Sequence, residues 1–381
     1  MKKKVKKKIC FLRTTSIVND SRSMKEIKSL SKKYDVKVLG WDRQGIVKKN
    51  DTYLNEQNIS SSFFKLKCDY GAGKKNLLKM IAFEFWLFFK LVVHINDYDV
   101  IHSCDLDTGI IARIACKLLH KKMVYDIFDY YIDAHKFSDA ISKFLEKQEI
   151  KTINYANVTI ICTEQRRKQI TKANPKKVYI IHNTPDLNMK LTDIHLKGER
   201  NKIDVVYFGV LQDDRLLKEI GEAIKNNKYI NLHIGGFGIY EDYFRNLSKI
   251  ANNIYYYGSL KYNEVLCLEK QADVLFATYN PAIANHNYSA PNKFYEAIAL
   301  GKPIIVCKNM GIDELVKKDN LGKIIDYSAR DFITSILSLR EETFCSQNSK
   351  RIYSECYSWN IMEKRLLKAY KEIFESDVEK C

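Results

Sequence analysis

Short apolar runs alternate with amphipathic helical stretches along this 381-residue chain, and that alternation most limits what the chain can fold into. Apolar runs at residues 8–12, 98–103 and 203–208 each precede a stretch in which apolar residues recur at helical spacing. Strands that alternate with helices form a parallel sheet covered on both faces. The sequence therefore predicts an α/β protein.

The alternation is interrupted once. Residues 185–200 are polar and lack an apolar period, so we expect a linker there. The chain length is typical of two or three domains. We therefore predict two doubly wound, Rossmann-like domains facing each other across a cleft, an N-terminal domain of residues 1–190 and a C-terminal domain of residues 191–355. We expect residues 356–381 to form a C-terminal helix that packs back toward the N-terminal domain.

Positive charge is concentrated in the first half of the chain. Residues 1–200 contain 39 lysines and arginines against 22 acids, whereas residues 201–381 contain 24 of each. Such asymmetry indicates an anionic partner for the first half alone. Anionic membrane, nucleic acid and an acidic substrate all fit it, and so does simple solubility.

The cysteines and the apolar segments bear on localisation. None of the ten cysteines has CxxC or Cys/His ligand spacing, so we expect no zinc site and no disulfides, as in a reducing compartment such as the cytoplasm. The apolar run after the basic start is short and meets Arg13, so we expect no signal peptide. The most apolar segment, residues 80–95, contains Glu84 and Lys90 and is shorter than the roughly 20 residues that a membrane span needs. It is either a buried core helix or a helix at a membrane interface.

The stretch Ser289–Val306 combines signals of a loop, a short helix, a turn and a buried strand. Pro291 suits a helix start, and Gly301 suits the left-handed residue that ends one. Lys293 and Glu296 are three residues apart and so share one helix face. A carboxylate there can accept two hydrogen bonds from a ribose diol, and the free N–H groups of the helix start can hold a phosphate. The stretch therefore predicts a nucleoside diphosphate site, with a solvated Lys and Glu on an amphipathic helix as the alternative.

Three further features of the second half suit phosphates. Gly209 follows a strand and lets the backbone approach a ligand closely. Arg215 opens the next predicted helix, where its guanidinium could bind a diphosphate or form a surface ion pair with Asp213 or Glu219. Gly236 lies in a second glycine loop, residues 235–238, which does not fit the GxGxxG pattern and so gives a nicotinamide cofactor little support.

The order of these motifs resembles a known family. The second half is similar to the donor domain of family-4 glycosyltransferases, which are retaining enzymes of the GT-B architecture, and the first half is similar to their acceptor domain. The most specific part is PNKFYEAIALGKPIIV. The similar segments are residues 19–43, 98–119, 123–133, 205–215, 232–238, 254–260 and 291–306.

The resemblance implies which residues bind the donor. Glu296 matches the acid that binds the nucleotide ribose, and Arg215 matches the region of basic residues on the donor phosphates. The loop and helix start at Ser289, Ala290 and Pro291 match the segment near the diphosphate. The predicted donor-binding residues are Gly209, Arg215, Gly236, Ser289, Ala290, Pro291, Asn292, Lys293 and Glu296.

The implied mechanism needs neither a metal nor another cofactor. Arg215, Lys293 and the helix amides would stabilise the charge on the leaving diphosphate. Asp126 and Asp129 follow a predicted strand of the first half and are candidates for a polar role at the acceptor, or for a helix cap or a local ion pair. We therefore expect Arg215, Lys293, Asp126 and Asp129 to be the catalytic residues and no metal site.

Three positions depart from the family pattern. Tyr288 stands where many members have a second acid, Val210 where many have an arginine, and Phe128 where many have a histidine. These departures are the features that a non-catalytic relative would show.

The expected function is transfer of a sugar, with retention, from a nucleoside-diphosphate sugar to a glycan or lipid-linked acceptor, in the synthesis of a cell-surface polysaccharide or glycoconjugate. We expect a cytoplasmic protein, peripheral on the inner face of the membrane, whose basic half docks on anionic lipid. The alternatives are a nucleotide-sugar epimerase of the same architecture and a non-catalytic nucleotide-sugar-binding homologue. No nucleic-acid-binding pattern is recognisable, so we expect no nucleic acid partner.

Overall fold

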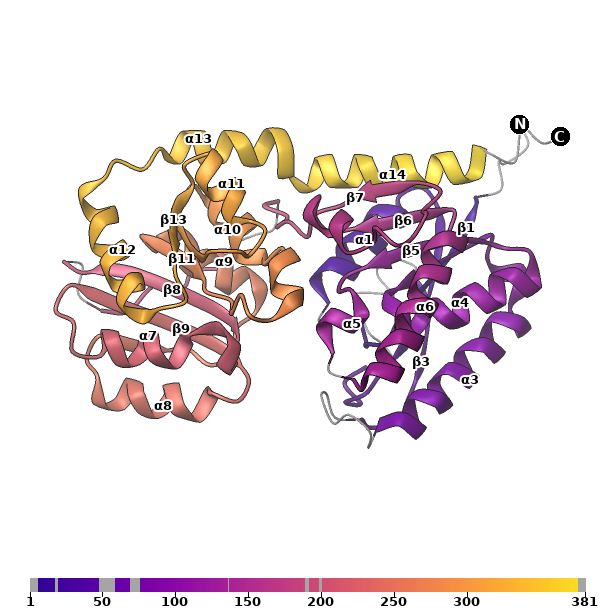
Figure 1. The fold of residues 1–381 in the computed structure, drawn as a ribbon, viewed down its shortest axis with the longest axis horizontal. Helices are drawn as coiled ribbons and strands as arrows, with labels where there is room; N and C mark the ends of the chain where they lie inside the picture. Colours follow the sequence, from indigo (N-terminus) through magenta and orange to yellow (C-terminus); the bar gives the residue numbers. More distant parts are fainter. Residues whose placement is uncertain are drawn as a thin grey trace. The chain divides into compact units, whose positions relative to one another are not determined.

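The computed structural model describes residues 6–17, 20–47, 59–68, 76–135, 137–188, 192–198 and 201–375. The chain divides into two compact units (Figure 1). Unit 1 comprises Met1–Ile181 and Met362–Cys381, and unit 2 comprises His182–Ile361. The division therefore falls nine residues before the predicted boundary at residue 190, and the end of the chain belongs to unit 1.

Unit 1 is built on a seven-stranded sheet of order β3-β2-β1-β4-β5-β6-β7, in which every neighbouring pair is parallel. Its central strands are buried on both faces, which explains their nearly continuous apolar sequence. The helices and strands are β1 (Lys8–Arg13), α1 (Ser21–Ser31), β2 (Asp35–Trp41), β3 (Ser60–Phe64), α3 (Leu77–Val93), β4 (Val100–Cys104), α4 (Asp105–Leu119), β5 (Lys122–Ile127), α5 (Tyr131–Ala134), α6 (Asp139–Tyr155), β6 (Val158–Ile161) and β7 (Val178–Ile180).

The last helix, α14 (Trp359–Glu375), is packed into unit 1 over most of its length. Tyr370 lies among Tyr34, Phe374 and His102 of the same unit. The Tyr370 hydroxyl is 2.7 Å from Nδ1 of His102 on β4. Residues more than 250 positions apart in sequence thus complete one core.

Unit 2 is built on a six-stranded parallel sheet of order β10-β9-β8-β11-β12-β13. Its helices and strands are β8 (Ile203–Val210), α7 (Leu217–Ile224), β9 (Ile230–Phe237), α8 (Glu241–Ile250), β10 (Ile254–Tyr256), α9 (Tyr262–Gln271), β11 (Val274–Ala277), α10 (Asn292–Leu300), β12 (Ile304–Cys307), α11 (Asp313–Lys318), β13 (Gly322–Ile325), α12 (Ala329–Glu341) and α13 (Ser346–Ile352).

Both units confirm the predicted doubly wound α/β fold. In each sheet the chain starts near the middle and reverses direction once, between β1 and β4 in unit 1 and between β8 and β11 in unit 2. Ligands of such sheets bind beyond the carboxyl ends of the strands at that reversal. Within the described residues, no helix is both long and apolar enough to cross a bilayer.

Candidate functional site

Helix α10 has the boundaries that its sequence predicts. Pro291 is its N-cap residue, with φ −62°, and the helix runs from Asn292 to Leu300. Gly301 ends it with φ +70°, a left-handed conformation that suits glycine. The strand that follows, β12, is buried along its whole length. α10 packs against β11, β12, α9 and α13, so its start lies next to the reversal of the unit 2 sheet.

Two glycines bring the carboxyl ends of β8 and β9 unusually close. Gly209 pairs with Gly236 in the parallel register. A Cβ atom on Gly236 would lie 1.7 Å from the carbonyl oxygen of Gly209, and its φ of +133° is unfavourable for other residues. Gly236 is therefore required by the backbone at this edge, whatever ligand it binds, whereas a Cβ atom on Gly209 would meet the ammonium group of Lys293 at 2.9 Å and no backbone atom as close.

Lys293 connects the start of α10 to this edge. Its side chain is buried, and its ammonium group donates to the carbonyl oxygen of Phe208, the residue before Gly209. The same group lies 4.6 Å from the centre of the Tyr207 ring and would be 2.9 Å from a Cβ atom on Gly209. A fixed positive charge is thus held at the end of β8, and the alternative of a solvated lysine is wrong.

Glu296 is also buried, being 3% exposed, and its Oε1 accepts a 2.9 Å hydrogen bond from the hydroxyl of Tyr262 on α9. A second acid, Glu269, lies on the same helix as Tyr262 and is 1% exposed. Within the described part of the chain, neither carboxyl oxygen of Glu269 has a hydrogen-bond partner. Burial and the nearby charge of Glu296 raise the pKa of Glu269 well above its usual value, which favours its neutral form.

Arg215 does not open a helix, contrary to the prediction. Leu216 adopts a left-handed conformation with φ +57°, and α7 begins only at Leu217. Tertiary hydrogen bonds explain this break, because the Thr278 hydroxyl donates to the Arg215 carbonyl oxygen and the Leu216 N–H donates to the Tyr327 hydroxyl. Both backbone groups are thereby taken from a continuous helix.

The Arg215 guanidinium is held by its neighbours. Nη1 lies 3.0 Å from Oδ2 of Asp214 and 2.9 Å from Nε2 of His286, and the guanidinium stacks 3.6 Å above the Tyr279 ring. The acid that pairs with Arg215 is thus Asp214, rather than Asp213 or Glu219 as the sequence suggested. Contact between Arg215 and the phosphates of a donor stays a prediction.

The remaining predicted donor residues surround the start of α10. Ser289 is buried, and its hydroxyl donates to the carbonyl oxygen of His286 at 2.9 Å. Ala290 and Asn292 are partly exposed on either side of Pro291. Unit 2 therefore contains every predicted donor-binding residue, whereas Asp126 and Asp129 belong to unit 1.

Asp126 lies in a fully buried polar cluster of unit 1. Its Oδ1 accepts from Arg22 at 2.5 Å, and Arg22 also donates to Glu26 at 3.1 Å. Burial would raise the pKa of Asp126, but the charge of Arg22 and the neighbouring His102 outweigh it and lower the pKa. A carboxylate without any exposed surface cannot meet a substrate in this conformation. The arrangement of Asp126 is that of a structural ion pair, and the predicted catalytic role gains no support from it.

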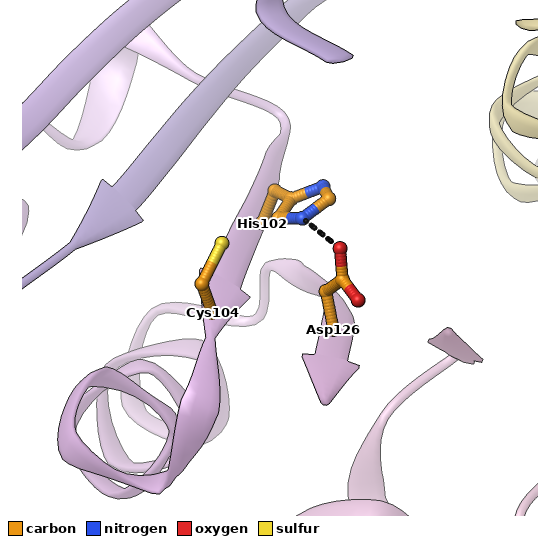
Figure 2. A group of neighbouring side chains, drawn as sticks. All are labelled: His102, Cys104 and Asp126. Carbon is orange, nitrogen blue, oxygen red and sulfur yellow. Dashed lines mark ion pairs between the residues drawn. The ribbon is translucent and has the colours of Figure 1, made fainter. Parts of the chain in front are cut away.

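Figure 2 shows His102, Cys104 and Asp126, which are the one group of potential metal ligands found among the described residues. Nε2 of His102 lies 3.5 Å from Oδ2 of Asp126. Burial raises the pKa of the Cys104 thiol well above its usual value, although metals bind the thiolate. Arg22 already balances the charge of Asp126. The chemistry of this donor set therefore fits a polar core cluster better than a metal site.

The side chain of Asp129 has different surroundings from that of Asp126. Its carboxylate is 56% exposed and pairs with Arg166 at 2.9 Å, as in the predicted local ion pair. Phe128, between the two acids, lies 4.0 Å from the guanidinium of Arg13 and 4.0 Å from that of Arg22. The Phe128 ring thus stacks with two cations. It stands where many members of the resembled family have a histidine.

Asp105 is a residue that the sequence did not single out. It has a left-handed φ of +59°, and its Oδ1 accepts from the N–H groups of Phe128 and Asp129. Its Oδ2 accepts from Arg13 at 2.5 Å. Because Arg13 ends β1 and Asp105 follows β4, this pair lies at the reversal of the unit 1 sheet. A polar residue directly after a buried strand was the available signal.

Solved structures share this architecture. HepE from Anabaena, crystallised with UDP and glucose, is similar with a TM-score of 0.71 and 17% identity over 96% of this chain and 100% of HepE. Sucrose-phosphate synthase from Thermosynechococcus elongatus has a TM-score of 0.71 at 10% identity, over 97% and 100%. A putative UDP-N-acetylglucosamine 2-epimerase from Listeria monocytogenes has a TM-score of 0.66 at 13% identity, over 98% of both chains. The fold is thus that of the two-domain GT-B proteins.

A match to a protein-family model indicates the class of protein that unit 2 resembles. Residues 202–342 match the family model described as glycosyl transferases group 1. This match covers fewer than half of the residues, but it contains β8, β9 and α10 and hence the predicted donor site. No curated protein sequence matches the chain.

Proposed function

We propose that this protein is a glycosyltransferase that moves a sugar from a nucleoside-diphosphate sugar to a glycan or lipid-linked acceptor. The observation that supports it most is the convergence of Gly209, Gly236 and Lys293 at the carboxyl end of β8, with Glu296 one turn further along α10. Glycine backbone, a buried ammonium group and a helix start are the parts of a phosphate site. The group 1 match over the same residues supports transfer chemistry.

In this proposal each residue contacts a different part of the donor. Glu296 accepts hydrogen bonds from the ribose hydroxyls and keeps its orientation through Tyr262. The N–H groups of Ala290 and Asn292 and the ammonium group of Lys293 approach the diphosphate. Ser289, whose N–H and hydroxyl both donate to the His286 carbonyl oxygen, holds the loop before them. Arg215 adds positive charge, with Asp214 and His286 fixing its guanidinium. These cations stabilise the leaving group, so transfer needs no metal. Retention is proposed from the family-4 resemblance alone.

The donor and pathway are proposals of the same kind. HepE binds UDP and glucose, which supports a uridine nucleotide as the first donor to try. A family-4 enzyme of polysaccharide or glycoconjugate synthesis would use a lipid-linked or growing glycan as acceptor, and unit 1 would bind it.

The test is nucleotide release by the full chain, measured with a panel of nucleoside-diphosphate sugars in the presence and absence of glycan and lipid-linked acceptors. We expect release that depends on the acceptor, and Glu296→Gln to lower it at least tenfold while Glu219→Gln, at an exposed acid of unit 2, does not. Acceptor-independent conversion of the sugar would instead identify an epimerase, the activity assigned to the Listeria relative. Nucleotide binding without any turnover would identify a non-catalytic homologue.

A further inference from the structure

Helix α3 of unit 1 has an apolar outer side. Leu78 is 80% exposed, Phe85 is 72% exposed and Phe89 is 63% exposed. Together with Ile81 and Val93, these residues recur every three or four positions, so they form one stripe along the helix. The inner side is apolar too, with Phe83, Leu87 and Leu91 buried against the sheet. A helix that is apolar on both sides is unusual at a surface.

The neighbouring helices extend this stripe. Helix α4 packs between α3 and α6, and all three belong to unit 1 (Figure 1). On α4, Ile114 is 45% exposed and Leu118 is 61% exposed; on α6, Ile141 is 46% exposed and Phe144 is 59% exposed. Single exposed apolar residues are ordinary, but a contiguous apolar patch marks an interaction site. We call the outer sides of α3, α4 and α6 the apolar face.

The charges on the apolar face are mostly positive. The exposed ionisable side chains of the three helices are Asp139 and the four lysines Lys117, Lys143, Lys147 and Lys151. Three of these lysines are spaced by four residues along α6, so they share one side of that helix. Phe144 lies one turn from Lys147 on the same exposed side.

We propose that the apolar face docks in the plane of an anionic lipid bilayer. Phenylalanine and leucine side chains would enter the boundary between headgroups and acyl chains, and the lysines would contact lipid phosphates. A second copy of this chain is a poorer occupant, because a two-fold interface would bring together the lysines of both copies with few exposed acids on either face to pair with them. The inference does not depend on the proposed sugar transfer, and it is tested without a donor.

The experiment is co-sedimentation of the full chain with vesicles of phosphatidylcholine alone and with about 30 mol% phosphatidylglycerol. We expect binding to the anionic vesicles that weakens as salt rises. Phe85→Ser combined with Phe89→Ser should lower the partition coefficient at least tenfold. Lys143→Gln, Lys147→Gln and Lys151→Gln together should lower it similarly for anionic vesicles and flatten the salt dependence. Ile250→Ser, at a 77% exposed apolar residue of unit 2, is the matched control and should change nothing.

Two measurements keep the result interpretable. Thermal unfolding shows that each variant is folded, and the mass in solution shows its oligomeric state. Absence of wild-type binding at low salt would overturn the proposal, as would equal binding by the Phe85/Phe89 double variant. A wild-type dimer that this variant converts to a monomer would assign the face to self-association instead. Loss of vesicle binding with an unchanged nucleotide-induced thermal shift would separate docking from donor binding.

Discussion

A carboxyl group that is buried without a cation beside it has a raised pKa in this protein, as Glu149 shows. Glu149 on α6 is fully buried and accepts hydrogen bonds from the Tyr125 hydroxyl at 2.7 Å and the Tyr131 N–H at 3.2 Å. Burial raises the pKa of Glu149 to about 8, despite these two donors. The neutral acid is therefore favoured in the folded protein at neutral pH.

This ionisation makes stability depend on pH in a predictable direction. The folded pKa of about 8 lies above the unfolded value of roughly 4.3, so between them the folded state holds a proton that the unfolded state has released. Glu149 therefore lowers the free energy of unfolding as pH rises through that window. We expect Glu149→Gln to make the urea midpoint less dependent on pH between about 5 and 8. The control is Glu146→Gln, at a surface ion pair with Lys172. Equal pH slopes in wild type and Glu149→Gln would contradict this account.

At the scale of elements, the pairing of β8 with β9 depends on one glycine. We expect Gly236→Ala to lower the free energy of unfolding by about 3 kcal/mol or more, because the new methyl group would overlap the Gly209 carbonyl oxygen in a strained conformation. Gly258→Ala is the matched control, since its φ is also positive at +66° but no atom lies within 4 Å of the added carbon. It should cost about 1 kcal/mol. Chemical denaturation measures both, and similar losses would show that close approach is not the cause.

The attachment of α14 to unit 1 includes one buried hydrogen bond. We expect Tyr370→Phe to lower the free energy of unfolding by about 1–2 kcal/mol, because Nδ1 of His102 loses its hydroxyl partner in a fully buried place. Tyr34→Phe tests the same aromatic cluster at a partly exposed ring and should have a smaller effect. Urea denaturation measures both variants, and an equal effect would mean that the hydroxyl of Tyr370 contributes nothing specific.

The elements show which predictions local sequence supports. The limits of α10 follow from Pro291, Gly301 and the apolar spacing between them, all within a short segment. The burial of Lys293 and Glu296 could not be predicted, because their partners Phe208 and Tyr262 are 85 and 34 residues away in sequence. The same reason explains Arg215, whose conformation is set by Thr278 and Tyr327.

At the scale of the whole molecule, alternation of strands and helices was sufficient to predict two doubly wound units. Alternation reflects only short-range sequence pattern, so the predicted division at residue 190 came from the polar stretch at residues 185–200. The structure divides the chain after Ile181. The acids at residues 126 and 129 were predicted as a pair, but they pair with different arginines, because Asp126 lies within β5 and Asp129 lies in the loop after it. Unit 1 is therefore the less predictable of the two units.

Metal dependence is a property of the whole reaction. Because the proposed site uses Arg215, Lys293 and backbone amides against the diphosphate, we expect sugar transfer to continue unchanged in excess EDTA. Acceptor-dependent nucleotide release measures this, with a metal-dependent sugar transferase as the assay control. Loss of release in EDTA and its recovery with Mg²⁺ or Mn²⁺ would show that a cation takes part.

The central claim is that the buried carboxylate on α10 binds the nucleotide of a sugar donor. The most direct measurement is calorimetric titration of the wild-type protein, Glu296→Gln and Glu219→Gln with the nucleoside-diphosphate sugar that gives the largest thermal shift. We predict that Glu296→Gln weakens binding about 10–100-fold, the loss of one charged hydrogen-bonding group, and that Glu219→Gln binds like the wild type. Equal affinity of all three proteins would contradict the claim.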